Sequence, residues 1–365
     1  MLIGASVLSA AGSLPLQVLP FLVLTLIAEA RFEIAFAGWV GSAFLVGMLS
    51  SSLLLPLLGV SRLNRGHALC CLGAIVFSIA VTMSSISPLL FLVLWFVVGF
   101  ACGCLQFLGA TTAAAAPNKK QAFALRLAMA LIVASSVIVA LAQFGSQKSY
   151  TTLALFLVGA FGLAAFIGLP LYRNVFQNQV TTAVVGNALE QRSWSGLIVV
   201  FAFFVGQPGF WAYAMQSASE RGLNLKDAAL VIASSKVISA LFLLYNAKGS
   251  SSGFGILGLL GLGFSIAIGI VAMTNSEAVV LFFVGFLIWE LALNLLSARL
   301  QGLVVAASPG HAGVWITGAI LLGAATGPIA HGAAIGFGVG WVFLTYAAVA
   351  SLLPFLWAWS GSRVA

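Results

Sequence analysis

Two ionisable residues, Lys236 and Glu290, lie deep inside long apolar stretches of this 365-residue sequence. Lys236 falls about ten residues from one end of its stretch and Glu290 about thirteen, or roughly 15 Å and 20 Å at the rise of a helix. A charge buried in a membrane costs about 3 kcal/mol or more unless it meets a partner or water. We therefore predict an ion pair in which Glu290 takes up a proton when the pair is disturbed. The alternative is a static pair that only fixes helix packing.

Polar side chains continue beyond Glu290 in one stripe. Asn294, Ser297 and Gln301 follow it at i+4, i+7 and i+11, positions that share one face of a helix. Amides, hydroxyls and aromatic rings elsewhere suit a polar organic ligand, because binding pockets are mostly apolar with a few directed polar groups. The predicted substrate-binding residues are Gln17, Gln106, Arg126, Gln207, Trp211, Tyr213, Gln216, Asn294 and Ser297. For each amide, the alternative is a hydrogen bond between helices, worth about 0.6 kcal/mol.

The stretch from residue 203 to residue 216 reads FFVGQPGFWAYAMQ and holds several of these candidates. Pro208 has no backbone N–H, so it can bend a helix and expose backbone groups to a cavity. Trp211 follows Gln207 by one helical turn, and both can face the same ligand. Tyr213 points elsewhere, and its alternative role is an anchor at the membrane interface.

The other residues capable of chemistry are dispersed. Arg126 either contacts an anionic substrate or extends from a helix end to the cytoplasm. His311 and His331 are expected near the two membrane faces, and the four cysteines lack the paired spacing with histidine that a zinc or redox site needs. Membrane-embedded enzymes gather histidines and acids at an interface, which this sequence does not do. We therefore predict no metal site, no cofactor and no enzymatic activity.

Composition identifies the surroundings of these residues. Hydrophobic residues make up 62% of the chain and charged residues 6%, whereas soluble domains carry roughly a quarter charged residues. The net charge of +8 is spread singly or in pairs over the gaps between apolar runs. That pattern indicates membrane topology rather than a nucleic-acid-binding surface. Because lipid cannot pair with backbone groups, we predict an all-α polytopic membrane protein in contact with membrane lipid.

Apolar runs of about 20 residues predict twelve membrane-spanning helices. The predicted spans are 4–28, 34–59, 68–86, 88–115, 122–144, 151–173, 195–218, 227–246, 253–273, 277–305, 311–331 and 334–358. Cytoplasmic loops carry an excess of Lys and Arg, and the excess here favours cytoplasmic termini. The residues then assigned to the cytoplasmic side are Arg62, Arg65, Lys119, Lys120, Arg126, Arg173, Arg192, Lys248, Arg299 and Arg363. Those assigned to the outer side are Arg31, Lys148, Arg221 and Lys226.

The chain divides near its midpoint. The longest polar gap, residues 174–194, separates a predicted six-helix bundle at 1–173 from a second at 195–365. Similar fragments recur in order at an offset near 190 residues: EARFEIAFAGWVGSA with ERGLNLKDAALVIAS, VVGF with FVGF, and AAAAPNKK with VAASPGHA. Parallel repeats of this kind are a known plan of transporters. With no charge at mid-depth, the N-terminal half is expected to be the more passive of the two.

Six plus six helices, a central linker and a basic loop after the second span together resemble the major facilitator superfamily. In that family the loop usually reads G-x-L-A-D-R-x-G-R-R, and here it reads GVSRLNRGH from Gly59 to His67, with Ser61 in place of the acid. The resemblance implies two pseudo-symmetric six-helix bundles and a gating role for Arg62 and Arg65. It also implies a cavity lined by the first, fourth, seventh and tenth spans, which carry most of the polar candidates.

These observations together predict a monomeric secondary active transporter in the cell inner (plasma) membrane. It would move a small organic solute, with an anion or zwitterion favoured by Lys236 and Arg126, and couple that movement to protons through Glu290. The alternatives are a membrane receptor or scaffold that binds a ligand without moving it, and a membrane-embedded enzyme. Neither the identity of the substrate nor the direction of transport follows from these residues.

Overall fold

The computed structural model describes residues 2–29, 33–58, 60, 63–84, 87–144, 149–172, 191–248, 256–275, 277–306 and 312–362. These residues form fifteen α-helices and contain no β-strand. The first seven are α1 (Leu2–Gln17), α2 (Leu19–Ala28), α3 (Ile34–Leu57), α4 (Arg65–Ser84), α5 (Pro88–Ala114), α6 (Lys119–Phe144) and α7 (Tyr150–Leu171). The other eight are α8 (Gln191–Ala212), α9 (Ala214–Glu220), α10 (Leu225–Lys248), α11 (Ile256–Asn275), α12 (Val279–Ala306), α13 (Ala312–Gly336), α14 (Gly340–Ala350) and α15 (Leu353–Ser362).

Each of the twelve predicted spans coincides with one helix or with a broken pair of helices. Eleven helical segments are long and apolar enough to cross a membrane, and α1 with α2 completes a twelfth span bent by 41°. Two further spans, α8 with α9 and α14 with α15, are also interrupted. The prediction of twelve spans is therefore confirmed, although of these three interruptions it anticipated only one, a bend in the seventh span at Pro208.

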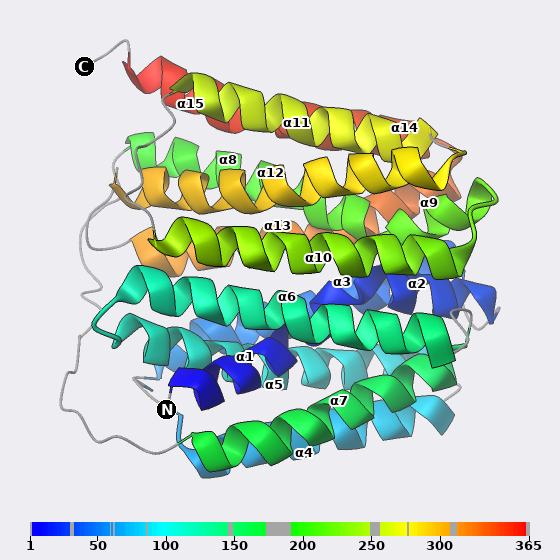
Figure 1. Ribbon diagram of the computed structural model, residues 1–365, viewed down its shortest axis with the longest axis vertical. Helices are drawn as coiled ribbons and strands as arrows, with labels where there is room; N and C mark the ends of the chain where they lie inside the picture. The colour runs from blue at the N-terminus through cyan, green and yellow to red at the C-terminus, as the bar shows by residue number, and fades with distance from the viewer. Residues whose placement is uncertain are drawn as a thin grey trace.

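The helices form two bundles that lie side by side with their axes roughly parallel (Figure 1). In the first bundle, α1 packs against α5, α6 and α7; in the second, α8 packs against α13 and α14. Two seams join the bundles: α3 packs against α13, and α6 packs against α10. The predicted linker at 174–194 lies outside the described residues up to residue 190, and α8 begins at Gln191.

The helices run between two sides of the molecule. The termini side is the one where α1 begins and α15 ends, at the left of Figure 1. The far side is the one where α2 ends and α3, α10 and α12 begin. On the far side, α2 also packs across the bundle boundary against α8 and α9.

Glycine allows the seam between α3 and α13 to pack closely. A Cβ atom on Gly38 would lie 2.5 Å from the carbonyl oxygen of Pro328, well inside van der Waals contact. Within the second bundle, Gly209 of α8 faces Gly327 of α13 in the same way, with a Cβ on Gly209 only 2.7 Å from a backbone oxygen. Helices in lipid associate through close packing of this kind, which explains why the chain carries 39 glycines.

Proline explains the break in the first span. Pro20 stands in the first turn of α2, where its missing N–H and fixed φ are tolerated. In a continuous helix its N–H would have bonded to the carbonyl of Leu16, so that carbonyl has no partner within the helix. The chain turns at Val18, between the two helices. This arrangement leaves the last residues of α1 with backbone groups available to other helices.

The seventh span breaks later than its proline suggested. Pro208 was expected to bend or open the helix, but α8 continues through it to Ala212, and the interruption falls at Tyr213. A proline keeps a helical φ and removes one hydrogen bond, so the helix can pass through it when its neighbours hold it. At Tyr213 the N–H bonds to the carbonyl of Phe210, three residues back, which leaves the carbonyl of Gly209 available.

Candidate functional site

Lys236 and Glu290 meet at one depth inside the second bundle. Each lies eleven residues after the first residue of its helix, α10 or α12, on the far side. That spacing corresponds to roughly 16 Å, and about 15 Å is half the hydrocarbon thickness of a bilayer. The Nζ atom of Lys236 lies 3.5 Å from Oε1 of Glu290. The two residues are 1% and 5% exposed, so the predicted ion pair is present and buried.

The Lys236 ammonium has three neighbours, one of them across the bundle boundary. Besides Glu290, it donates a 2.7 Å hydrogen bond to Oε1 of Gln17 and lies 4.6 Å from the ring centroid of Trp211. The hydrogen bond to Gln17 crosses from the second bundle to the first. The ammonium is thus held by one anion, one amide oxygen and one aromatic face.

The break in the first span supplies a second contact between the bundles. Nε1 of Trp211 donates a 3.0 Å hydrogen bond to the carbonyl of Leu16, the group that Pro20 leaves without a helical partner. Leu16 and Gln17 therefore bind neighbouring groups of the second bundle, one through its backbone and the other through its side chain. The sequence LPLQVLP, with Pro15 and Pro20 flanking these residues, was the signal that could have identified this contact.

Aromatic rings form the wall behind Lys236. Trp211 stacks on Trp289, with ring centroids 5.8 Å apart and planes inclined by 20°, and also packs on Phe286. Nε1 of Trp289 donates to Oε1 of Gln207 at 2.8 Å, and Nε2 of Gln207 donates to the carbonyl of Ala347 at 3.0 Å. Gln207 is 1% exposed and holds Trp289 in place within the second bundle. Trp211, but not Gln207, reaches the ammonium.

A second set of contacts closes the far side. The hydroxyl of Tyr213 donates a 3.1 Å hydrogen bond to the carbonyl of Ile34 in the first bundle. His331 is 4% exposed, stacks on Phe343 at 4.4 Å and meets the edge of Tyr213 at 4.9 Å. Its Nδ1 lies 2.8 Å from the carbonyl of Gly209, and since a carbonyl only accepts, Nδ1 carries the proton. His331 was expected near a membrane face; it lies five residues before the far-side end of α13, and its side chain is buried there.

The remaining predicted residues divide into two groups. Asn294, Ser297, Gln106 and Arg126 are half-buried and lie on the termini side of the ion pair. There, Asn294 donates to the carbonyl of Glu290, Ser297 accepts from Gln301, Gln106 donates to Gly12, and Arg126 donates to the carbonyl of Gln106 at 3.1 Å. Gln216 lies toward the far side and bonds to Glu220 on the same helix.

The gating and metal-site predictions fall elsewhere in the chain. Arg62 lies outside the described residues, and Arg65 is the first residue of α4. Among the described residues, no group of three or more His, Cys, Asp and Glu side chains is arranged to hold a metal ion. The candidate site is centred on the ammonium of Lys236 and the aromatic wall beside it.

Comparison with known proteins identifies the fold. No protein-family model matches the sequence, and no curated protein matches it at a significant level. Among solved structures, a variant of the nucleoside transporter NupG superposes with a TM-score of 0.76 at 14% identity, covering 98% of this chain and 99% of that one. The human organic anion transporter MFSD10 (TETRAN) gives 0.68 at 15% identity, covering 98% and 97%. A variant of the E. coli fucose:proton symporter FucP gives 0.59 at 14%, covering 98% of both chains. The chain has the fold of the major facilitator superfamily.

Proposed function

We propose, on the premise of this fold, that the chain is a secondary active transporter that moves a small organic anion or zwitterion by alternating access, coupled to protons. The proposal is based mainly on the buried Lys236–Glu290 pair, in which Lys236 also donates a hydrogen bond to Gln17 beside the break in the first span. The structural neighbours are named as transporters of nucleosides, organic anions, and fucose with protons, which supports the class.

Charge balance favours an anionic group on the substrate. Lys236 is buried among Glu290, Gln17 and Trp211, so an incoming carboxylate must displace one of them to reach the ammonium. Displacing Glu290 leaves a buried carboxylate without its cation, which is unfavourable in a medium of low dielectric constant. Binding a proton removes that cost. One proton on Glu290 for each anion on Lys236 keeps the site electrically neutral, and this exchange is the proposed coupling step.

The cross-bundle contacts link occupancy of the site to movement of the bundles. The bond from Lys236 to Gln17 and the bond from Trp211 to Leu16 both join the two bundles, so both must break when the far side opens. A substrate that engages Lys236 and Trp211 competes with the first of these bonds. Interrupted helices at corresponding places in two repeats are the feature expected around a transporter's binding site.

The burial of side chains favours a conformation that is closed on the far side. Trp211, Tyr213 and His331 are buried there, whereas Gln106, Arg126, Asn294 and Ser297 are half-buried on the termini side. With the termini in the cytoplasm, as the distribution of Lys and Arg favours, the closed far side is the outer side of the inner membrane. Arg126, half-buried on the termini side, is then a candidate contact for an anion that moves toward Lys236.

Transport in proteoliposomes tests the proposal. Candidate anions and zwitterions are first screened by thermal shift, since a ligand at 100 times its Kd stabilises the folded state by about 2.7 kcal/mol. The purified protein should then exchange labelled ligand for unlabelled ligand across the membrane, and accumulate it when a pH gradient is imposed. Ligand binding without exchange would identify a receptor instead of a carrier.

A substitution of Glu290 tests the proposed coupling step. Glu290→Gln should retain exchange of ligand without a gradient but lose accumulation driven by the pH gradient, because the amide cannot bind the proton. Glu33→Gln, an exposed carboxylate before α3, is the matched control and should retain both activities. Accumulation by Glu290→Gln at the level of the native protein would exclude Glu290 as the coupling group.

A further inference from the structure

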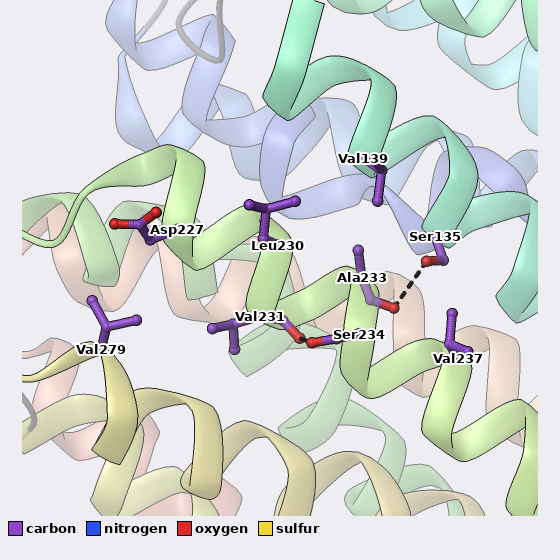
Figure 2. Close-up of a pocket in the computed structure, with 9 residues that line it drawn as sticks. All are labelled: Ser135, Val139, Asp227, Leu230, Val231, Ala233, Ser234, Val237 and Val279. Atoms are coloured by element: carbon purple, nitrogen blue, oxygen red, sulfur yellow. Dashed lines mark hydrogen bonds between the residues drawn. The ribbon is translucent and has the colours of Figure 1, made fainter.

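A groove lies along the seam between α6 and α10 (Figure 2). Lys236 and Glu290 are not among the residues that line it. Its volume is about 530 Å³, within the range of roughly 300–1,000 Å³ that holds small-molecule ligands. Residues of α6, α10 and α12 line it: Ser135, Val139, Asp227, Leu230, Val231, Ala233, Ser234, Val237 and Val279. The groove thus includes residues of both bundles.

The groove opens away from the centre of the protein. Asp227 precedes Lys236 by nine residues and Ser234 precedes it by two, so both lie roughly on the opposite face of α10 at about 100° per residue. Val139 and Val237 form its rim and are each 38% exposed, while Ala233 on its floor is 1% exposed. Because α6, α10 and α12 are membrane-spanning helices, the molecules that surround this opening are lipids.

The length of the groove matches one leaflet of a bilayer. Asp227, in the first turn of α10 on the far side, marks one end, and Val237, ten residues further along the helix, marks the other. Ten residues of helix span about 15 Å, which is half of a hydrocarbon core about 30 Å thick. The groove therefore runs from the headgroup level to the middle of the membrane.

The walls suit a hydrocarbon chain. Both serine hydroxyls are already bonded to backbone carbonyls, Ser135 to Ala233 at 2.9 Å and Ser234 to Val231 at 3.0 Å (Figure 2). The other lining side chains, apart from Asp227, are Val, Leu and Ala. Asp227 is exposed, and its carboxylate stands at the headgroup end of the groove. A negative charge at that point complements a cationic headgroup.

We propose that this groove binds one acyl chain of a phospholipid from the far-side leaflet, and that Asp227 binds the ammonium of its headgroup. The ligand is phosphatidylethanolamine, because a primary ammonium can donate hydrogen bonds to a carboxylate. The trimethylammonium of phosphatidylcholine has no N–H to donate, and phosphatidylglycerol has no cation to offset its phosphate. Because α6 and α10 belong to different bundles, the bound lipid stabilises the seam between them.

Native mass spectrometry of the full-length protein tests this assignment. The detergent-purified protein is mixed in turn with dioleoyl phosphatidylethanolamine, phosphatidylcholine and phosphatidylglycerol, and the lipid retained per protein is measured. We expect one phosphatidylethanolamine molecule to be retained with roughly twofold to fivefold preference over phosphatidylcholine, the range expected for an exposed charge pair. Phosphatidylglycerol should bind more weakly still.

Two variants and a control locate the site. Asp227→Asn should remove the preference while leaving some lipid bound, whereas Glu33→Gln, a carboxylate at another far-side helix start, should keep it. Val139→Trp fills the groove without altering its charge and should reduce retention of all three lipids. Equal retention of the three lipids by the native protein, or equal loss of preference in Asp227→Asn and Glu33→Gln, would overturn the proposal. Unchanged lipid retention by Val139→Trp would also overturn it. This variant tests the groove independently if Asp227→Asn does not fold.

Discussion

Replacing Pro20 with alanine should weaken the closure of the far side. The substitution adds a backbone N–H four residues after Leu16, where it can complete the helical hydrogen bond that proline forbids. The carbonyl of Leu16 would then accept a hydrogen bond from within its own span, and this N–H would compete with Nε1 of Trp211 for the same carbonyl. The first span can straighten, and the bond that holds Trp211 against the first bundle can break at a lower cost.

Two quantities bound the size of the effect. The lower bound is the hydrogen bond from Trp211 to Leu16, since a typical hydrogen bond contributes about 1 kcal/mol. The upper bound is the penalty that proline imposes inside a continuous helix, about 3 kcal/mol. At about 1.4 kcal/mol for each factor of ten, the population open on the far side should rise between roughly fivefold and 150-fold.

Distances between spin labels on the far side measure that population. Glu33 before α3 and Arg221 after α9 are exposed residues of different bundles, and neither contacts the Lys236 site. Labels are placed on cysteines at these two positions after the native cysteines are replaced: Cys70, Cys71, Cys102 and Cys104. Pulsed electron paramagnetic resonance then reports short distances for the closed state and long distances for the open state.

The matched control is Pro15→Ala in the same helix. Its new N–H would bond to the carbonyl of Ala11, a group for which the described structure shows no bond to the second bundle, so the distance distribution should not change. Trp211→Phe removes the same hydrogen bond from the other side and should shift the distribution in the same direction as Pro20→Ala. If Pro20→Ala behaves like Pro15→Ala, the break does not control the closure.

Two further substitutions test the energetics of the buried pair and of the seam. Lys236→Ala leaves Glu290 buried without a cation, so it must either bind a proton or stay charged; we expect a loss of stability in thermal unfolding that grows as the pH rises, up to about 3–5 kcal/mol when Glu290 is ionised. Lys236→Met combined with Glu290→Leu should unfold near the native temperature at every pH yet not transport, and equal destabilisation by both at high pH would contradict the charge argument. Gly38→Ala places a methyl group 2.5 Å from the Pro328 carbonyl and should cost about 1–3 kcal/mol, while Gly73→Ala, with open space around it, should be neutral or slightly stabilising.

The fold follows from the sequence because lipid imposes a simple rule. Runs of about 20 apolar residues must be helices, so all twelve spans could be located from hydropathy alone. The breaks within them could not, since a break depends on which neighbour accepts the freed backbone group. Pro20 interrupts the first span because Trp211 binds the freed carbonyl, whereas the helix passes through Pro208.

The site was predictable where charge was involved and less so where amides were. Lys236 and Glu290 had to be paired to be buried, and similar predicted depths in two helices identified them as partners. An amide can satisfy its bonds in many ways. Gln207 uses both of its polar atoms inside the second bundle, while Gln17 faces the ammonium, and no spacing rule distinguishes the two.

The contacts between the bundles also explain why the first one seemed passive in the sequence. In the three contacts around Lys236 and the far side, the donors are Lys236, Trp211 and Tyr213 of the second bundle, whereas at the α6–α10 seam Ser135 of the first bundle donates to the carbonyl of Ala233. In those three contacts the first bundle supplies acceptors, two of which are backbone carbonyls that every residue possesses. Backbone acceptors cannot be recognised from the residue types or their spacing in a sequence. In the first bundle, these three contacts can therefore be altered by substitution at Gln17 or at Pro20, the proline that frees the Leu16 carbonyl. Pro20 does not itself contact the Lys236 ammonium, so its substitution tests the closure most directly.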